Sequence, residues 1–470
     1  MKTKSVKNKF HEAICAEGMS KIMKFLVFAI VLAVLSGCAT DSPAPIIGSP
    51  AGQNRTRSIA AEYEEYEAYE SDPEPIPFAV LHKRNNTRLA MYEPADGVYL
   101  GAWLRPDTTF RAFENKVGKR HAVYVHEMYL DDDIPVNWLL QCIATLATPL
   151  FIVHPPQHVD EISDEDLEAE DLLMPSVPSF FPFFGEIETP QPLTIEEQVV
   201  ILARRFGAFN LPMFVAFYPP GHGLAADEYL TLFRYARAVF MDYAPLTAFV
   251  WVAPDTRITP SSTFFPGNDS VDWVALPLFS GRNAYGFEKD ILEDFRPFYM
   301  AFGEHKPIML LPLGISHFSR ADYVYNLHPA ADEIRRVYHA LGTAFPRVGM
   351  IVYGDAFIMT PGTNDDFSIT LEQDLIETYR QIIDENHFIT SIDKDASNGF
   401  RQASTWVRSR FHGYYFENRV YIDTRTMENE LGISAPRQTT EINGWHFVES
   451  QRIPGHTVII CETRGIIFVE

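Results

Sequence analysis

The feature that most constrains the fold is a repeated pair of elements, a short apolar strand followed by an amphipathic helix. Runs rich in β-branched and aromatic residues predict strands at 97–104, 121–130, 149–154, 212–218, 247–253, 272–279, 307–314 and 348–355. Helical spacing of apolar residues lies between them, and helix ends are predicted at Gly118, Gly207, Gly303 and Gly342. Near-continuous apolar strands alternating with such helices are typical of a parallel sheet covered by helices. Eight of them predict an α/β fold, a (β/α)8 TIM barrel, over 78–390.

An open, doubly wound sheet is the competing architecture. No strand is followed by a glycine-rich phosphate loop, which favours the barrel. An insertion at 155–192 follows the third predicted strand and holds ten carboxylates without a Lys or Arg. Loops after strands lie on the active face of a barrel. The insertion is therefore either a lid or an acidic flap, and its role stays open.

The last segment, 395–470, changes to strand periodicity. A turn is predicted at Glu417–Asn418, the pairs Asn443–Gly444 and Arg464–Gly465 mark two more hairpins, and a short helix lies among the strands. A small α+β domain is expected. Its order of Tyr-hydrophobic-Asp, helix, Leu-Gly and strand-Asn-Gly-strand over 421–447 resembles the copper amine oxidase N-terminal-like stalk domain. The histidines of this segment are dispersed, so we expect no copper, no other metal and no cofactor.

The N-terminal segment, 1–38, has the pattern of a bacterial lipoprotein signal. Lys21 and Lys24 precede an apolar run at 25–35, which is too short to span a membrane and suits a secretory signal. Ser36 and Gly37 before Cys38 look like a lipobox, which predicts lipidation of Cys38 and a location on the outer face of the bacterial cell membrane. Translation starts at Met1 or at Met23. The following segment, 39–77, is predicted to be an acidic tether.

Charge and cysteine content narrow the choice of partners. The formal net charge is −23, and no basic patch is evident, so nucleic acid is excluded as a partner. Cys142 and Cys461 fall in different predicted domains, which argues against a structural disulfide. The expected partners are an oligosaccharide or polysaccharide, for the reasons below, and the membrane through the lipid anchor.

Within the barrel, the sequence resembles glycoside hydrolase family 26, the β-mannanase-like retaining enzymes. The resemblance covers about 95–355 and is carried by DGVYLGAWL, FENKVGKRHAVYV, PMFVAFY, DEYLTLFRYARAVF, AFVWVAPD, SVDWVALPLF and KPIMLLPLGIS. It implies catalytic glutamates at the ends of the fourth and seventh strands. Pro220 and Pro312 stand at those places, and neither 211–224 nor 307–321 contains an Asp or Glu. We therefore expect both catalytic glutamates to be missing. Retaining hydrolysis needs two carboxyls about 5–5.5 Å apart, and these two strand ends supply neither.

Other side chains at predicted strand ends remain as candidates. Substitute catalytic carboxylates are Glu127, Asp255 and Asp355, although an Asp beyond a strand commonly caps the next helix or turn. Sugars pack against aromatic faces and bind polar groups at the rim. The candidate substrate-binding residues are Trp103, His154, Tyr218, His222, Trp251, His317 and Tyr353.

These observations predict a membrane-anchored carbohydrate-binding protein with a glycoside hydrolase-like barrel that lacks both catalytic glutamates, and they leave its enzymatic activity open. One alternative is an active O-glycosyl hydrolase acting on mannan-like or envelope polysaccharide with relocated carboxylates. A second is a non-catalytic envelope scaffold that presents its C-terminal domain to a protein. The sequence leaves the glycan and the oligomeric state open.

Overall fold

The computed structural model describes residues 74–156, 193–221, 223–283, 286–287, 289–319, 323–360, 363–393, 401–450 and 453–470. Cys38, His222, the signal segment, most of the predicted tether and most of the acidic insertion lie outside these residues. Across the described part of the chain, no helix combines the length and apolar character needed to cross a membrane.

Eight parallel strands form a closed barrel. Their order is β13-β10-β7-β6-β5-β4-β3-β2, and pairing of β13 with β2 closes the ring. The eight strands are β2 (Val98–Leu104), β3 (Val123–Tyr129), β4 (Thr148–His154), β5 (Met213–Phe217), β6 (Thr247–Val252), β7 (Trp273–Ser280), β10 (Ile308–Ile315) and β13 (Val348–Asp355). Each coincides with a strand predicted from the sequence to within two residues at either end. The (β/α)8 barrel is therefore confirmed, and the open sheet is excluded.

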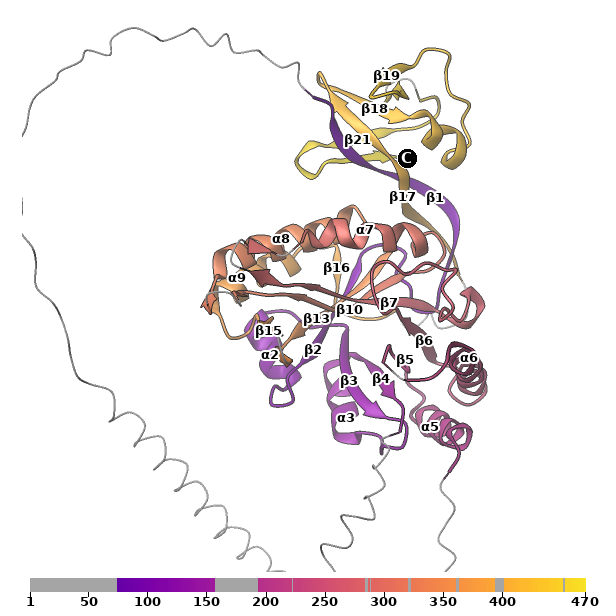
Figure 1. The fold of residues 1–470 in the computed structure, drawn as a ribbon, viewed down its shortest axis with the longest axis vertical. Coiled ribbons are helices and arrows are strands. Elements are labelled where there is room, and N and C mark those ends of the chain that lie inside the picture. Colours follow the sequence, from indigo (N-terminus) through magenta and orange to yellow (C-terminus); the bar gives the residue numbers. More distant parts are fainter. Residues whose placement is uncertain are drawn as a thin grey trace, which may run out of the picture. The chain divides into compact units, whose positions relative to one another are not determined.

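Helices follow seven of the eight strands and cover the outside of the barrel (Figure 1). They are α2 (Phe110–Val117), α3 (Val136–Thr145), α5 (Ile195–Phe209), α6 (Ala226–Tyr243), α7 (Ile291–Phe302), α8 (Leu327–Thr343) and α9 (Gln373–Ile383). Between β6 and β7 the chain forms only a 3-10 turn, Asn268–Ser270. Short strands after the barrel strands are β8 (Arg282–Asn283), β9 (Gly286–Phe287), β11 (Phe318–Ser319), β12 (Val324–Tyr325), β14 (Phe357–Thr360), β15 (Thr363–Asp366) and β16 (Phe388–Ile389).

Two predicted helix ends are wrong. Gly207 lies inside α5, which ends at Asn210 with a left-handed φ of 50°, and Gly342 lies inside α8. Both glycines instead permit close packing. A Cβ on Gly342 would lie 2.8 Å from the ring of His387, and a Cβ on Gly207 would lie 1.9 Å from the carbonyl oxygen of Tyr243. At these two positions, the glycine in the sequence indicates a tight contact of the helix with its neighbour and not the end of the helix.

The barrel has two apolar layers, one inside the barrel and one between the strands and the helices, and they show to which side each strand side chain points. One cluster holds alternate strand residues and no helix residue, so it fills the barrel interior; Ala248, Val250 and Trp273 belong to it. The other cluster joins the strands to the helices and contains Phe249 and Trp251. Successive side chains of a strand point to opposite faces, and β6 follows this alternation residue by residue.

A second sheet contains seven strands in the order β19-β20-β18-β17-β1-β22-β21. Six come from the C-terminal segment: β17 (Arg401–Phe416), β18 (Arg419–Asp423), β19 (Thr440–Ile442), β20 (Trp445–Glu449), β21 (Val458–Cys461) and β22 (Ile466–Val469). The short helical turn is Thr426–Glu430. With the three predicted turns in place, the expected α+β architecture is confirmed.

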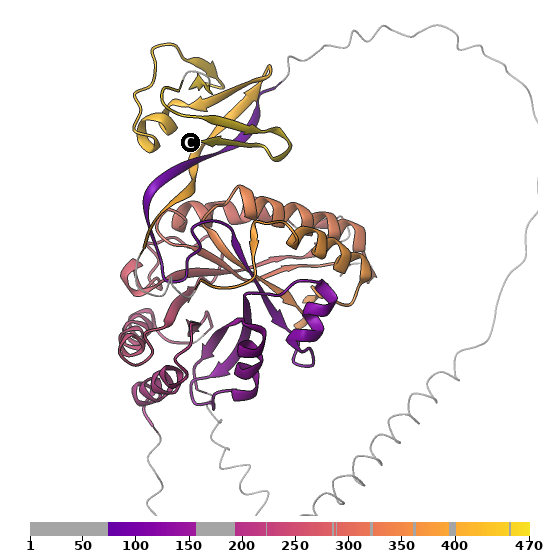
Figure 2. The same cartoon turned by 180° about the vertical axis from the view of Figure 1, so that it is seen from behind.

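One inner strand of this sheet, β1, comes from the other end of the described chain. β1 (Ile76–Leu89) pairs with β17 in antiparallel and with β22 in parallel orientation. Figures 1 and 2 show β1 and β17 running side by side from the barrel into the second sheet. The range 78–390, predicted as barrel, therefore includes a strand of the second sheet. Sequence order misplaced β1 because its partners lie more than 300 positions away in the chain, beyond the reach of local pattern.

Candidate functional site

The carboxyl ends of the barrel strands form the face on which active sites of this architecture lie. Pro220 lies in the turn after β5 and is exposed, and Pro312 lies within β10 and is buried. A proline side chain neither donates nor accepts a proton. Neither proline can therefore act as an acid, base or nucleophile at these two strand ends.

Glu127 and His154 lie together at this face. They come from the paired strands β3 and β4, and His154 Nε2 is 3.1 Å from Glu127 Oε1. Both side chains are partly open to solvent, at 48% and 30% exposure for Glu127 and His154. Among the three predicted carboxylates, Glu127 is the one that combines a place near the strand ends with an imidazole partner.

Asp355 is wholly buried at the end of β13. Its Oδ2 accepts a hydrogen bond of 2.6 Å from the Thr370 hydroxyl, and its Oδ1 accepts one of 3.1 Å from the Thr370 N–H. The carboxylate anchors the segment that leads into α9. This geometry is that of a turn-stabilising Asp, the structural alternative recognised from the sequence.

Asp255 follows β6 on the surface. Its Oδ1 accepts a 2.7 Å hydrogen bond from the Arg257 N–H, and its Oδ2 lies 3.4 Å from the Arg257 guanidinium. The backbone hydrogen bond is the main cause that lowers the pKa of Asp255, with a further contribution from the guanidinium. A carboxyl group held in its ionised form is a poor general acid.

Two predicted stacking residues do not face the barrel mouth. Trp251 belongs to the layer between strands and helices, 5.0 Å from the Phe265 ring centroid, and Tyr353 packs 5.9 Å from Tyr379 in the same layer. Both are buried, so neither ring presents its face to the open barrel mouth, although Trp251 also lines the cavity described next. Strands with apolar residues on both faces do not reveal which set points outward. Trp103 is half-buried against the barrel interior.

An aromatic cavity opens beside the ends of β5 and β6. It encloses about 250 Å³, and its walls include Tyr218, Tyr229, Trp251 and Phe264. Tyr218 directly follows β5, has a φ of 48° and stacks on Phe217 at 4.4 Å. A positive φ is rare for a bulky residue and is concentrated at functional sites. Within the described residues, the buried Tyr218 hydroxyl has no hydrogen-bond partner.

A polar cluster that includes His317 lies after β10. His317 Nε2 is 3.6 Å from Asp366 Oδ2, and the Tyr325 hydroxyl donates to the same oxygen at 3.4 Å. The Asp366 Oδ1 accepts hydrogen bonds from the Ser368 N–H and hydroxyl. Burial lowers the pKa of His317, and Asp366 opposes that change, so the imidazole is biased toward its neutral form.

Sequence reasoning identified His317 but missed Asp366 and Tyr325. Asp366 ends the β14–β15 hairpin, which follows the last barrel strand, and Tyr325 comes from β12. The available signal was the adjacent pair Asp365–Asp366 in a loop on the active side. His222 lies outside the described residues.

The described residues contain no group of three or more His, Cys, Asp or Glu side chains arranged to hold a metal ion. Cys142 is buried and Cys461 half-buried, and both are free thiols. The arrangement at the barrel face therefore offers hydrogen bonding, one exposed carboxylate–imidazole pair and aromatic surface.

Comparisons with known proteins gave only distant structural matches. No family model and no curated protein matches the chain. Among solved structures, a GH26 β-mannanase from Bacteroides ovatus is 9% identical, with coverage of 63% of this chain and 90% of that one, at a TM-score of 0.39. GH26C from Muricauda sp. gives 11% identity, 63% and 87% coverage and a TM-score of 0.40. A GH128 endo-β-1,3-glucanase from Amycolatopsis mediterranei is 14% identical, with coverage of 60% of this chain and 99% of that one, at a TM-score of 0.34.

Proposed function

We propose that this protein is a membrane-anchored carbohydrate-binding protein whose barrel holds an oligosaccharide at its carboxyl face without cleaving it. The aromatic cavity beside β5 and β6 is the observation that carries the proposal. Sugar C–H faces bury apolar area against aromatic rings, while hydroxyl groups need polar partners nearby. Tyr218 offers both, because its ring lines the cavity and its hydroxyl lacks a partner among the described residues.

The carboxylates support binding over hydrolysis. A retaining mechanism requires a nucleophile and an acid–base group on opposite sides of one glycosidic bond. Asp355 is buried and hydrogen-bonded to Thr370, and Asp255 forms an ion pair with Arg257 on a surface loop. Of the three candidate carboxylates, Glu127 is the one with an exposed carboxylate beside an imidazole. One such group does not make the pair that glycosyl transfer to the enzyme demands.

An active glycosidase is the second candidate. The contact between Glu127 and His154 favours it, because a carboxylate–imidazole pair at a barrel mouth can exchange protons with a bound hydroxyl. In this reading the substrate is a mannan-like or envelope polysaccharide. Release of reducing ends that disappears in a Glu127→Gln variant distinguishes it from the binding protein.

The test uses residues 70–470, which form one compact unit. A panel of oligosaccharides is expected to give saturable binding with no release of reducing ends. Tyr218→Phe removes only the hydroxyl, so affinity should fall by roughly 2–10-fold, the value of one hydrogen bond. The free energy of unfolding should not fall, because a buried group without a protein partner is removed. Tyr243→Phe, on the surface of α6, is the control.

Two outcomes contradict the proposal. Failure of every glycan to bind would leave the envelope scaffold as the better description. Equal affinities of the Tyr218→Phe and Tyr243→Phe variants would move the binding site away from the aromatic cavity.

The proposed location rests on the sequence of the signal segment. Cys38 carries the lipid, and acyl chains provide the attachment because an acidic chain gains nothing from anionic headgroups. The second sheet then acts as a stalk between anchor and barrel. Incorporation of a labelled fatty acid into the wild-type chain, and its loss in Cys38→Ala, tests the anchor independently of sugar binding.

A further inference from the structure

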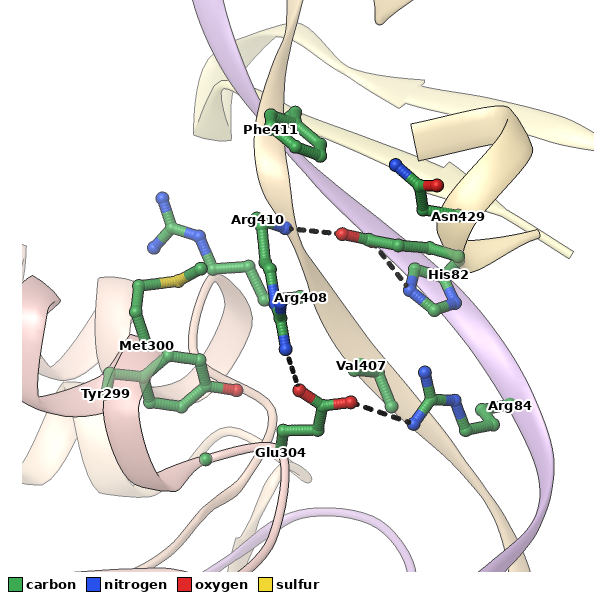
Figure 3. A pocket seen from close by; sticks show the side chains of 12 residues that line it. His82, Arg84, Tyr299, Met300, Glu304, Val407, Arg408, Arg410, Phe411 and Asn429 are labelled. Carbon is green, nitrogen blue, oxygen red and sulfur yellow. Dashed lines mark hydrogen bonds and ion pairs between the residues drawn. The ribbon is translucent and has the colours of Figure 1, made fainter. Parts of the chain in front are cut away.

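A second cavity is lined by residues of α7 and of the second sheet, not by the carboxyl ends of the barrel strands. It encloses about 270 Å³ where the end of α7 meets β1, β17 and the turn at 426–430 (Figure 3). Its charged lining consists of His82, Arg84, Glu304, Arg408, Arg410 and Glu430. Three guanidinium groups thus face two carboxylates, in a chain whose overall charge is −23.

Most of these charges already have partners. Glu304 forms an ion pair with Arg410, and its other oxygen lies 3.9 Å from Arg84 Nη1. Glu430 accepts a hydrogen bond of 3.0 Å from the Arg410 N–H and lies 3.2 Å from His82 Nε2. Figure 3 shows Glu304 between the two arginines as a carboxylate held by a pair of guanidinium groups.

Arg408 differs from the other two arginines. It is only 8% exposed, and within the described residues its guanidinium forms neither an ion pair nor a hydrogen bond with another side chain. Its aromatic neighbour is Phe345, whose ring centroid lies 4.6 Å from the guanidinium carbon. Burial, together with the nearby positive charge of Arg296, lowers the pKa of Arg408 to about 10, and Tyr299 and Glu293 oppose this change. A buried cation without a direct ion pair is costly, and a bound anion would compensate it.

We propose that this cavity is a binding site for a small oxyanion, a phosphate or carboxylate group carried on a molecule of about sugar size. Arg408 supplies a positive charge that no ion pair among the described residues holds, and guanidinium groups bind both kinds of oxyanion through paired N–H donors. Tyr299, Met300 and Phe411 add apolar wall beside the arginines, which suits an organic ligand better than a bare ion. The site is independent of the sugar site proposed in the aromatic cavity beside β5 and β6.

Glu304 competes with the ligand in this arrangement. Its carboxylate holds Arg84 and Arg410, so an entering anion has to share or displace it. Removing that negative charge frees two donors and removes a repulsion between like charges. Glu304→Gln is therefore expected to bind the anion more tightly than the wild type, an increase that a purely structural arginine cluster would not produce.

The experiment uses the full chain in neutral detergent at constant chloride concentration, with calorimetric titration of inorganic phosphate, glucuronate and glucose. Saturable binding is expected for phosphate, glucuronate or both, and none for glucose. Arg408→Gln should weaken binding by roughly tenfold or more, the value of one charge-assisted hydrogen bond. Arg437→Gln is the matched control, because this arginine is exposed and lies outside the cavity. Phosphate-only and glucuronate-only binding would each support the site and would identify its ligand class.

The proposal is overturned if the wild type binds neither anion saturably, or if Arg408→Gln and Arg437→Gln have the same affinity. It is also overturned if Glu304→Gln binds no more tightly than the wild type. Should circular dichroism show that Arg408→Gln is unfolded, Arg84→Gln replaces it. The Arg84 side chain is 41% exposed, so this substitution does not disturb the core. That variant must also bind more weakly than the control.

Discussion

Replacing Arg347 with methionine is expected to lower the free energy of unfolding by about 3–5 kcal/mol. Arg347 and Glu93 are 4% and 2% exposed, and Arg347 Nε lies 2.7 Å from Glu93 Oε1 while Nη2 lies 3.2 Å from Oε2. Glu93 Oε2 also accepts a 2.7 Å hydrogen bond from the Ala90 N–H. The single substitution leaves a carboxylate in the core without its cation, which is the costly way to break a buried pair. Urea denaturation measures the loss.

The pH dependence identifies the cause. Burial raises the pKa of Glu93, and Arg347 opposes that rise. Without Arg347 the folded-state pKa moves further above the unfolded value, so the folded variant takes up a proton more readily than the unfolded chain. Its deficit in stability should therefore shrink as the pH is lowered from about 8 to about 5. The double variant Arg347→Met with Glu93→Gln should lose less than Arg347→Met alone. An equal or larger loss in the double variant would show that packing, not the unpaired charge, determines the effect.

The barrel and the hairpins were predictable because their signals are local. Each barrel strand is an apolar run bounded by polar turns, and the turn residues Glu417, Asn418 and Asn443 adopt the positive φ values that such hairpin turns need. Strand number and helix alternation then leave few closed architectures. The position of β1 was not predictable in this way, since its pairing with β17 joins the two ends of the described chain.

The site was harder to predict than the fold, for a physical reason. Trp251 and Tyr353 lie near strand ends, as expected, but both faces of a barrel strand are apolar, so the sequence does not tell the inner side from the outer. Asp355 stands at a strand end as a catalytic residue would, and Thr370 uses its charge for structure. Asp366 and Tyr325 join His317 only through the short hairpins that fold over the barrel face.

The two cavities divide the possible functions of the molecule. The one beside the ends of β5 and β6 is aromatic and mostly apolar, and the Tyr218 hydroxyl in its wall has no hydrogen-bond partner among the described residues. The one beside α7 is rich in arginine. A neutral saccharide suits the first and an anionic group the second, since aromatic rings favour sugar faces and guanidinium groups favour oxyanions. Titrations with neutral and acidic glycans therefore report on the two sites separately.

Replacing Gly207 with alanine is expected to lower the free energy of unfolding by about 3 kcal/mol, although helix propensity alone favours alanine by about 1 kcal/mol. Gly207 lies inside α5, and an alanine Cβ there would lie 1.9 Å from the Tyr243 carbonyl oxygen and 2.9 Å from its carbon, at the end of α6. Both atoms are backbone, so no side chain can turn away, and the helices must separate. Arg204, whose guanidinium stacks on the Tyr243 ring at 4.7 Å and donates to its hydroxyl, would lose that contact.

Ala208→Gly is the matched control, because it makes the reverse change at the next, exposed position of the same helix. Propensity predicts a loss of about 0.5–1 kcal/mol for it and a gain for Gly207→Ala. If the close approach of α5 and α6 also acts at Gly207, both variants lose stability, and the larger loss is at Gly207. Thermal denaturation of the two variants separates these expectations by sign. A stabilised Gly207→Ala would mean that α6 yields at Tyr243 and that the contact between α5 and α6 is not tightly fixed.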